Sequence, residues 1–337
     1  MGAGIALLFA KKGVATRLKD IKTEFVANGM KTCRGLVAKE VKRKKLTKLQ
    51  ATRVLDCLSP TVDYRGLKHA DVVIEAVLED MEIKKTVLRE LAEATSPETI
   101  LATNTSSLRV TEMAENIDHP ERIVGLHFFN PPNKMPLVEI IRTEWTSDAA
   151  LAKAFAVVQR LGKTPVIVGD CVGFLVNRLL SPYMNEAGFL LAEVEDPMEI
   201  ERAAVDFGMP MGPLALSDLV GLDVAAHVAD NMHAAYGDRM KPAPFWDELK
   251  RLREGGNFKP KLVDTRRKQL QPVVASAASR LRKNGETLNR EQIIERLIFP
   301  VINEAAMCLQ EGVASRPDDV DLAMVFGTGF APFRGGP

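Results

Sequence analysis

The sequence predicts an α/β protein in which a doubly wound parallel sheet is followed by a duplicated all-helical domain. Three observations support this prediction. Short apolar runs alternate with helical segments as far as residue 169, strand-like runs then stop, and part of the helical half recurs 118 positions later. Strands that alternate with helices form parallel sheets covered on both faces, and an internal repeat at a fixed spacing indicates a duplicated unit.

The first elements follow from apolar runs and from the residues that end them. Residues 4–12 form a short apolar helix that ends before Gly13, a residue suited to the left-handed conformation after a helix. Residues 14–18 form a strand, with Asp20 just beyond its end. The polar, lysine-rich stretch 21–56 is predicted to be helical.

The alternation of strand and helix continues through the first half. Residues 71–77 are a nearly continuous apolar run, which is typical of a strand buried on both faces of a sheet. Apolar residues at helical spacing follow over 83–91, and residues 100–103 form the next strand. The polar cluster 104–107 is suited to begin a helix. Residues 165–169 form the last strand that the pattern predicts.

The helical half contains the repeat. Residues 178–187 and 296–305 share Arg-Leu, a proline and Asn-Glu-Ala at the same relative positions. Agreement in register over such a length is typical of a duplicated domain, and the second copy is the shorter one. We therefore expect a sheet domain over 1–169, a first helical copy over 170–262, a linker over 263–290 and a second copy over 291–337.

Composition excludes several classes of protein. The 337 residues are enough for two or three domains, and the net charge of +1 argues against a nucleic-acid binder. No uncharged apolar run reaches the roughly 20 residues that cross a membrane. The four cysteines have neither the spacing of a metal site nor that of a disulfide framework, so we expect no metal and a cytoplasmic location.

One charged segment needs a separate interpretation. Six basic residues lie between Lys39 and Lys48. We interpret them as a solvated helix face. The alternative is a patch that attracts the phosphates of a carrier such as coenzyme A.

Glycines at the start of the chain are typical of a dinucleotide-binding loop. Gly2 and Gly4 begin the first helix, where glycine lets backbone N–H groups approach a pyrophosphate. A complete loop follows a strand and has further glycines, so we expect a Rossmann-type sheet whose first strand is missing. Asp20 is placed to bind ribose hydroxyls, which favours NAD over NADP. The alternatives are a flexible, glycine-rich start and a helix N-cap at Asp20.

One histidine and one glutamate are the strongest catalytic candidates. His127 ends the apolar run 123–126, the Asn-Pro-Pro sequence at 130–132 predicts a turn, and the next apolar run, 137–141, contains Glu139. Two short strands joined by this turn can bring the two side chains together. A carboxylate beside an imidazole fixes its tautomer and favours its protonated form, as a general base requires. The alternative is a structural core histidine with a surface glutamate.

Other polar candidates follow the ends of predicted strands. Glu79, Ser106 and His127 each lie at or after a different strand end. Because the carboxyl ends of strands in a doubly wound sheet face the ligand crevice, we expect these residues at one edge. Asn177 is a further candidate, because the second helical copy keeps the packing residues but has Glu295 at that position. The alternative is ordinary drift at a surface position.

Taken together, these residues resemble the L-3-hydroxyacyl-CoA dehydrogenase family, in particular the dehydrogenase portion of multifunctional alpha subunits of fatty-acid oxidation complexes. The similar motifs are spread over most of the chain. They are Met1-Gly-Ala-Gly-Ile-Ala6, Ala70-Asp-Val-Val-Ile-Glu-Ala-Val77, Asn104-Thr-Ser-Ser107, Gly125-Leu-His-Phe-Phe-Asn-Pro131, Met135-Pro-Leu-Val-Glu-Ile140, Gly173-Phe-Leu-Val-Asn-Arg178 and Met211-Gly-Pro213.

The resemblance implies an activity, a cofactor and a role for each candidate. The activity is NAD-dependent oxidation of L-3-hydroxyacyl-CoA to 3-oxoacyl-CoA in fatty-acid β-oxidation. His127 is similar to the family's catalytic base and Glu139 to its partner carboxylate, and Ser106 and Asn177 match substrate-binding residues. The positions that match the family's NAD site are Met1, Gly2, Gly4, Asp20, Val77, Leu78, Glu79, Lys84, Ser106 and Asn130.

The resemblance also implies partners. These are an enoyl-CoA hydratase domain in the full-length chain and a thiolase subunit, so we expect this chain to be truncated at both ends. Two other functions stay open. The chain could be a dehydrogenase of the same fold for a short 3-hydroxyacyl-CoA or a free hydroxy acid. It could also be a noncatalytic interaction or structural module that has lost NAD binding.

Overall fold

The computed structural model describes residues 1–337 apart from 195, 197, 255–260, 265–268, 271 and 282–287. The chain forms two compact units, Met1–Asp170 and Cys171–Pro337. The division predicted at residue 169 lies one residue before this boundary. Apart from residue 170, the three predicted parts that follow it lie within the second unit.

The first unit contains two sheets. β3 (Val72–Glu75), β4 (Ile100–Thr103), β5 (Ile123–Phe128), β6 (Leu137–Arg142) and β7 (Thr164–Gly169) form one sheet in this order, and β1 (Thr16–Lys19) and β2 (Leu58–Thr61) form a separate parallel pair. The predicted parallel arrangement holds from β3 to β5. β6 runs antiparallel to β5, because the turn that joins them is too short for a crossover between parallel strands.

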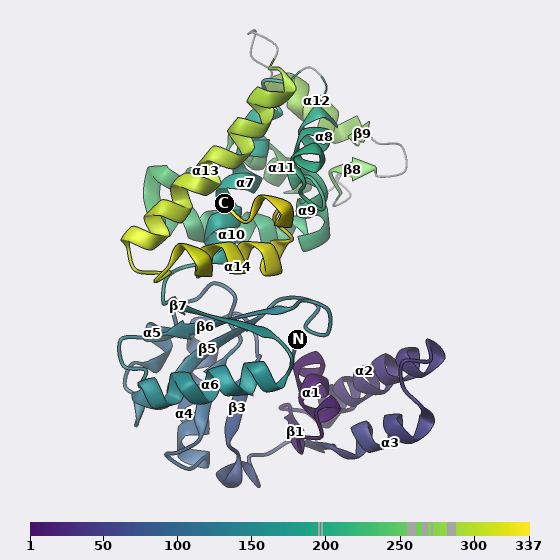
Figure 1. The fold of residues 1–337 in the computed structure, drawn as a ribbon, viewed down its shortest axis with the longest axis vertical. Coiled ribbons are helices and arrows are strands. Elements are labelled where there is room, and N and C mark those ends of the chain that lie inside the picture. The colour runs from purple at the N-terminus through teal and green to yellow at the C-terminus, as the bar shows by residue number, and fades with distance from the viewer. Residues whose placement is uncertain (195, 197, 255–260, 265–268, 271, 282–287) are drawn as a thin grey trace. The chain divides into compact units, whose positions relative to one another are not determined.

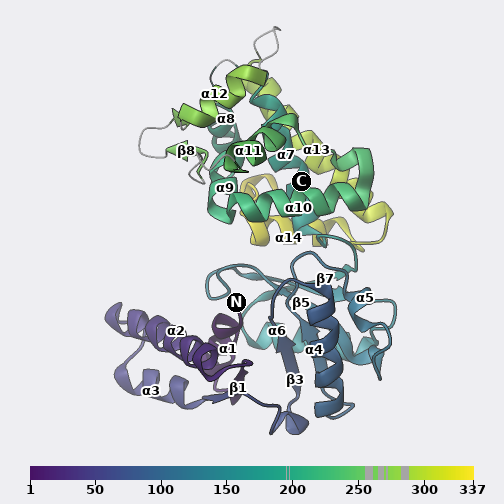
Figure 2. The same cartoon turned by 180° about the vertical axis from the view of Figure 1, so that it is seen from behind.

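Helices cover both faces of the larger sheet. α6 lies on one face (Figure 1), and α4 lies on the other, which is turned to the viewer in Figure 2. The helices of this unit are α1 (Gly2–Lys11), α2 (Thr23–Lys42), α3 (Lys48–Asp56), α4 (Met81–Ala94), α5 (Val110–Ala114) and α6 (Asp148–Arg160), with short 3-10 turns η1 (Leu67–His69) and η2 (Pro120–Arg122).

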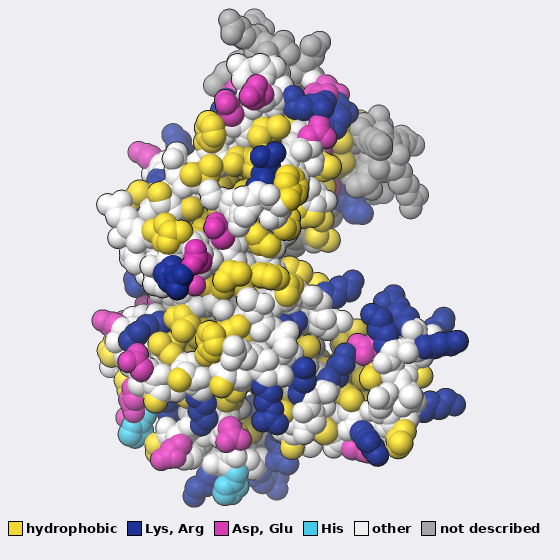
Figure 3. Space-filling model, in the orientation of Figure 1, with side chains coloured by type: hydrophobic (Ala, Val, Ile, Leu, Met, Phe, Trp, Pro, Cys, Tyr) yellow, Lys and Arg dark blue, Asp and Glu magenta, His cyan; other side chains and the backbone are white. Residues whose placement is uncertain are grey.

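The predicted helical stretch 21–56 is two helices rather than one. Lys44, between α2 and α3, has a positive φ of 57°, which ends the first helix. Thr47 then caps α3 by accepting a hydrogen bond from the backbone N–H of Gln50. The basic run from Lys39 to Lys48 is exposed and lies in the region where Lys and Arg side chains gather over α2 and α3 (Figure 3), as a solvated helix face requires.

The apolar composition of α1 is explained by burial on both sides. Ile5 and Leu8 pack into the core formed by the larger sheet and α6. Ala6, Leu7 and Ala10 pack into a second cluster formed with α2 and β2. A helix that is apolar all round must be buried all round, so α1 joins the two sheets of the first unit.

The second unit is helical, as predicted, apart from two short strands. Among the described residues, β8 (Val263–Asp264) and β9 (Gln269–Leu270) form an antiparallel pair that the sequence did not predict, since two residues cannot show an alternating pattern. The helices are α7 (Val176–Leu190), α8 (Met198–Phe207), α9 (Pro213–Val220), α10 (Leu222–Tyr236), α11 (Pro244–Glu254), α12 (Pro272–Leu281), α13 (Arg290–Gln310) and α14 (Pro317–Thr328), with 3-10 turns η3 (Gly237–Met240) and η4 (Pro332–Arg334).

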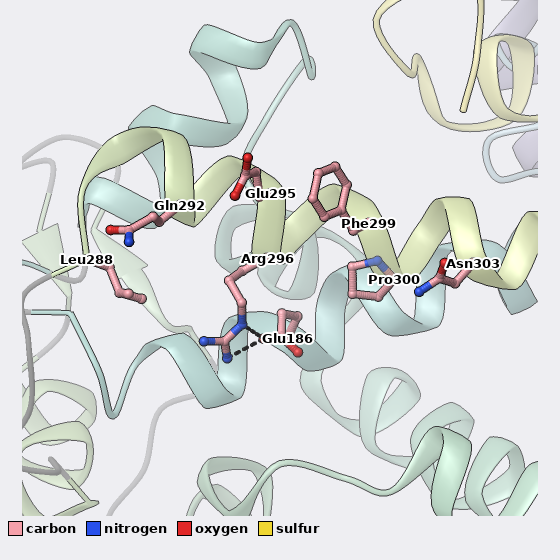
Figure 4. A pocket seen from close by; sticks show the side chains of 8 residues that line it. All are labelled: Glu186, Leu288, Gln292, Glu295, Arg296, Phe299, Pro300 and Asn303. Carbon is pink, nitrogen blue, oxygen red and sulfur yellow. Dashed lines mark hydrogen bonds and ion pairs between the residues drawn. The ribbon is translucent and has the colours of Figure 1, made fainter.

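The two copies of the repeat pack against each other through α7 and α13. Arg178 of α7 forms an ion pair with Glu304 of α13, with 2.6 Å between Nε and Oε1. The equivalent residues pair in the opposite direction, Arg296 of α13 with Glu186 of α7 (Figure 4). Such reciprocal contacts characterise a self-complementary interface between equivalent surfaces. The duplication therefore forms an internal two-fold arrangement within one chain.

Candidate active site

The hairpin of β5 and β6 places His127 directly opposite Glu139. Nδ1 of the imidazole lies 2.7 Å from Oε2 of the carboxylate. The His127 side chain is 7% exposed and that of Glu139 is fully buried. The contact expected between the two side chains is confirmed, and the alternative of a surface glutamate is wrong.

This contact orients the imidazole ring. A carboxylate only accepts hydrogen bonds, so Nδ1 carries the proton that it donates to Glu139. The ring also packs against Phe129, with 4.4 Å between the ring centroids. Nε2 is therefore the nitrogen that can take a proton from a reacting group, and the buried carboxylate stabilises the imidazolium that would form.

Glu79 joins the ends of β3 and β4. Its Oε1 accepts hydrogen bonds from the backbone N–H of Ser106 at 2.8 Å and from the Thr105 hydroxyl at 2.7 Å. The Ser106 hydroxyl lies 3.2 Å from the same oxygen. The sequence suggested that the cluster 104–107 begins a helix. This prediction is wrong, because α5 begins only at Val110. The donors of the cluster point at Glu79 instead, which fixes Ser106 at this edge of the sheet.

Asn104 links the ends of β4 and β5. Its Oδ1 accepts a hydrogen bond from the backbone N–H of Phe128 at 3.0 Å, directly after His127. This role of Asn104 was not predicted from the sequence. The available signal was a polar residue directly after a fully buried strand, where it lies at the crevice edge.

A buried ion pair contacts Glu79 at this edge of the sheet. Lys84 Nζ lies 3.0 Å from both carboxylate oxygens of Glu75 and 3.5 Å from Oε2 of Glu79. The side chains of Lys84 and Glu75 are each 1% exposed. Lys84 matched a cofactor-lining position, but its ammonium is held by two carboxylates. The pairing of Lys84 with Glu75 was not predicted from the sequence.

Two opposing effects set the pKa of Glu79. Burial raises it, but hydrogen bonds from Thr105 and Ser106 and the charge of Lys84 lower it by more, so the net pKa is below its ordinary value. Glu79 is therefore an anion at neutral pH, and the loop that contains Ser106 is organised around that charge.

We expect Glu79→Gln to lower the free energy of unfolding at neutral pH by about 1–2 kcal/mol, because charge-assisted hydrogen bonds are lost. A carboxyl with a lowered pKa binds fewer protons in the folded than in the unfolded state. Its contribution is thus present above the ordinary value of 4.5 and is lost as the pH falls through the folded-state pKa. The free energies of unfolding of the wild type and the Glu79 variant should therefore converge as the pH falls. Urea unfolding of the two proteins at decreasing pH measures this.

The matched control for this prediction is Glu82→Gln, which changes a carboxylate whose side chain is 85% exposed. That variant should unfold like the wild type at every pH. A difference between the Glu79 variant and the wild type that stays constant into acid would contradict the assignment of a lowered pKa.

The glycines at the chain start lie beside the same edge. A Cβ on Gly4 would be 2.7 Å from Cγ of Pro132, in the turn between β5 and β6 that also contains Asn130, and the nearest atom to a Cβ on Gly2 is in Ala76, directly after β3. The first turn of α1 has no acidic side chain and no side-chain cap. These features fit a pyrophosphate at the helix N-terminus.

The remaining predicted cofactor residues are exposed. Asp20 follows β1 and is exposed, and its Oδ1 accepts a hydrogen bond from the backbone N–H of Ile21. The helix N-cap proposed as an alternative for Asp20 is wrong, since α2 begins at Thr23 with Lys22 as its N-cap. Three exposed apolar side chains complete the set, at Met1, Val77 and Leu78.

Asn177 lies in the second unit, within the first turn of α7, and is half-buried.

The described residues contain no group of three or more histidine, cysteine or acidic side chains that could hold a metal ion. In the same part of the chain, no helix has the length and apolar character needed to cross a bilayer.

Comparisons with known proteins point to one family. Residues 1–171 match the family model for the NAD binding domain of 3-hydroxyacyl-CoA dehydrogenase, and residues 173–264 match the model for its C-terminal domain. The chain is 40% identical, over 349 aligned residues, to the fatty acid oxidation complex subunit alpha of Acinetobacter baylyi. The alignment covers 100% of this chain and 48% of that subunit, so the chain spans about half the length of the curated relatives it matches.

Solved structures show the same likeness. The 3-hydroxybutyryl-CoA dehydrogenase of Escherichia coli K12 is 30% identical, with a TM-score of 0.84 over 99% of this chain and 88% of that one. The dehydrogenase part of multifunctional enzyme 1 from C. elegans is also 30% identical, with a TM-score of 0.66 over 97% of this chain and 76% of that one.

Proposed function

Since the chain belongs to the 3-hydroxyacyl-CoA dehydrogenase family of NAD-dependent dehydrogenases, we propose that it oxidises L-3-hydroxyacyl-CoA to 3-oxoacyl-CoA. The observation that supports this reaction most strongly is the 2.7 Å contact between His127 and Glu139 at the edge where strand ends meet. A buried imidazole held by a carboxylate suits the removal of a hydroxyl proton.

In the proposed mechanism, side chains of this protein accept the proton of the substrate hydroxyl. His127 accepts the proton of the 3-hydroxyl group on Nε2, and Glu139 stabilises the resulting imidazolium through Nδ1. Ser106 and Asn177 bind the substrate and orient the reacting oxygen and the thioester. A bound NAD would supply the acceptor for the hydride from C3 of the acyl chain, so that the alcohol would become a ketone.

We assign the NAD site to the same edge of the first unit. The backbone at Gly2 and Gly4 would hold the pyrophosphate, and Asp20 would accept hydrogen bonds from the ribose hydroxyls. Glu79 and the buried Lys84 would fix the loop that contains Ser106 within the NAD site. The other residues assigned to the site are Met1, Val77, Leu78, Ser106 and Asn130.

The test is a pair of measurements on the chain. Titration with NADH, followed by its fluorescence, should show saturable binding. Reduction of 3-oxoacyl-CoA thioesters by NADH should then be observed, with turnover well above that of a free 3-oxo acid, because the carrier supplies binding energy. Varying the acyl chain length gives the substrate preference.

Each contrary result selects an alternative. The absence of saturable NADH binding would favour a noncatalytic interaction or structural module. Equal turnover of the free acid and the thioester would favour a dehydrogenase of hydroxy acids. Turnover confined to the shortest thioester would favour a short-chain 3-hydroxyacyl-CoA substrate.

We propose a role in fatty-acid β-oxidation for the whole protein, because the relatives are alpha subunits of fatty acid oxidation complexes. In that setting an enoyl-CoA hydratase domain would supply the 3-hydroxyacyl-CoA, and a thiolase subunit would cleave the 3-oxo product. We further propose that the protein acts in the cytoplasm.

A further inference from the structure

His127 lies on a part of β5 that continues beyond the end of the neighbouring strand β4. The last paired residues of β4 and β5 are Thr103 and Gly125, and β5 runs past them to Phe128. On its other side, this part of β5 pairs with β6 as far as Phe128 and Val138. In the described part of the chain, the backbone around His127 therefore pairs with a strand on one side only.

The side chain of Asn104 takes the place of a strand on the other side. The backbone N–H of Phe128 donates to Oδ1 of Asn104 at 3.0 Å, where a longer β4 would have supplied a carbonyl group. The planar peptide group that carries this N–H joins Phe128 to His127, so the hydrogen bond restricts the backbone of His127 directly.

Asn104 is itself held in place. Its backbone N–H donates to the carbonyl of Glu75 at 2.9 Å, at the end of β3. The side chain of Glu75 is 1% exposed and pairs with Lys84, so this anchor is part of a buried network. Because Oδ1 of Asn104 accepts from an N–H group, the amide oxygen faces Phe128 and the amide nitrogen does not.

We propose that Asn104 is a positioning residue for His127. Its amide oxygen holds the end of β5 so that Nδ1 of the imidazole stays on Glu139 and Nε2 stays directed at the reacting hydroxyl. The inference rests on the proposed function, since it concerns the geometry of the base in that reaction. A small misplacement of a catalytic group lowers a rate by up to about 100-fold, so the hydrogen bond matters more for turnover than for substrate binding.

Two substitutions separate the acceptor from the rest of the side chain. Asn104→Leu keeps a similar shape but leaves the Phe128 N–H without its acceptor, and turnover should fall about 10–100-fold with little change in the KM for the acyl-CoA. Asn104→Asp keeps an oxygen in the same place and adds a negative charge, which favours the imidazolium. The pH at which the rate is half-maximal should therefore rise by about 1, and turnover above that pH should approach the wild-type value.

A second measurement uses neither cofactor nor substrate. The imidazole of His127 is titrated by NMR in the chain labelled with ¹³C-histidine, and its signal among the five histidines is identified by its absence in His127→Gln. The titration midpoint should rise in the aspartate variant. It should fall in the leucine variant, because the imidazole is held less firmly against its carboxylate. The charged side chains at this edge stay the same in these proteins, and they include Glu139, Glu79, Glu75 and Lys84.

This titration distinguishes a failure of the inference from a failure of the proposed function. A chain that does not oxidise 3-hydroxyacyl-CoA still reports whether Asn104 positions the imidazole. Asn28, an exposed asparagine of α2, is the matched control. Leucine or aspartate at position 28 should change neither the turnover nor the titration of His127.

Two results would overturn the proposal. Wild-type turnover and a wild-type titration of His127 in Asn104→Leu would mean that pairing with β6 is sufficient to position the base. Turnover in Asn104→Asp that is as low as in Asn104→Leu at every pH would mean that the amide nitrogen is needed, and it would place Asn104 in contact with the substrate or the cofactor. The aspartate variant keeps the hydrogen bond and decides the question alone if the leucine variant does not fold.

Discussion

Replacing His127 by glutamine is expected to lower the turnover number by about 10²–10⁴-fold, the usual contribution of a positioned general base. The glutamine amide can form hydrogen bonds but cannot accept a proton near neutral pH. Because the residue acts on the hydroxyl and not on the carrier, we expect the KM for the acyl-CoA to change far less. Steady-state rates with L-3-hydroxyacyl-CoA and NAD provide the measurement.

The chain contains a matched control for this substitution. His119 also contacts a carboxylate through Nδ1, with 3.1 Å to Oε1 of Glu121, but both side chains are more than half exposed. His119→Gln should leave turnover unchanged. NADH binding should be the same in both variants and the wild type. If His127→Gln retains most of the wild-type rate, His127 is not the base.

The features that the sequence predicts well are those determined by residues close to one another along the chain. The strand at 100–103 has the predicted bounds, because three buried apolar residues and a buried threonine end at a polar cluster. The contact between His127 and Glu139 could also be predicted. A short turn fixes the pairing of two strands, and side chains directly opposite each other on adjacent strands lie on the same face.

Features that depend on distant residues were not predictable in the same way. The hydrogen bonds of Glu79 to the loop at Ser106 join positions 27 residues apart, and no local pattern records which donors a carboxylate will meet. The strand Leu58–Thr61 has one buried residue and a proline, so its pairing with β1 decides its conformation. The repeat indicates that α7 and α13 are equivalent, but it does not indicate that they pack against each other, which the structure shows.

Replacing Glu139 by glutamine has the second-largest expected effect and tests the contact itself. The substitution preserves shape, but an amide can donate to Nδ1, which would place the ring proton on Nε2 and leave no nitrogen to accept the hydroxyl proton. The imidazolium would also lose its stabilising charge. We expect turnover to fall by at least about tenfold and by up to about 10⁴-fold, as for other carboxylates that orient a catalytic histidine.

The division between turnover and KM distinguishes this role from a structural one. Glu139 is fully buried and touches His127, so its effect should appear in turnover with little change in the KM for either substrate. Glutamine keeps the volume of the glutamate side chain, and its amide can still form a hydrogen bond with Nδ1 of His127, so no buried polar group is left without a partner. Thermal unfolding should therefore be close to that of the wild type. Glu144→Gln, an exposed carboxylate just after β6, is the matched control and should behave as the wild type. A rise in KM at unchanged turnover would place Glu139 in substrate binding and remove it from the proton-transfer step.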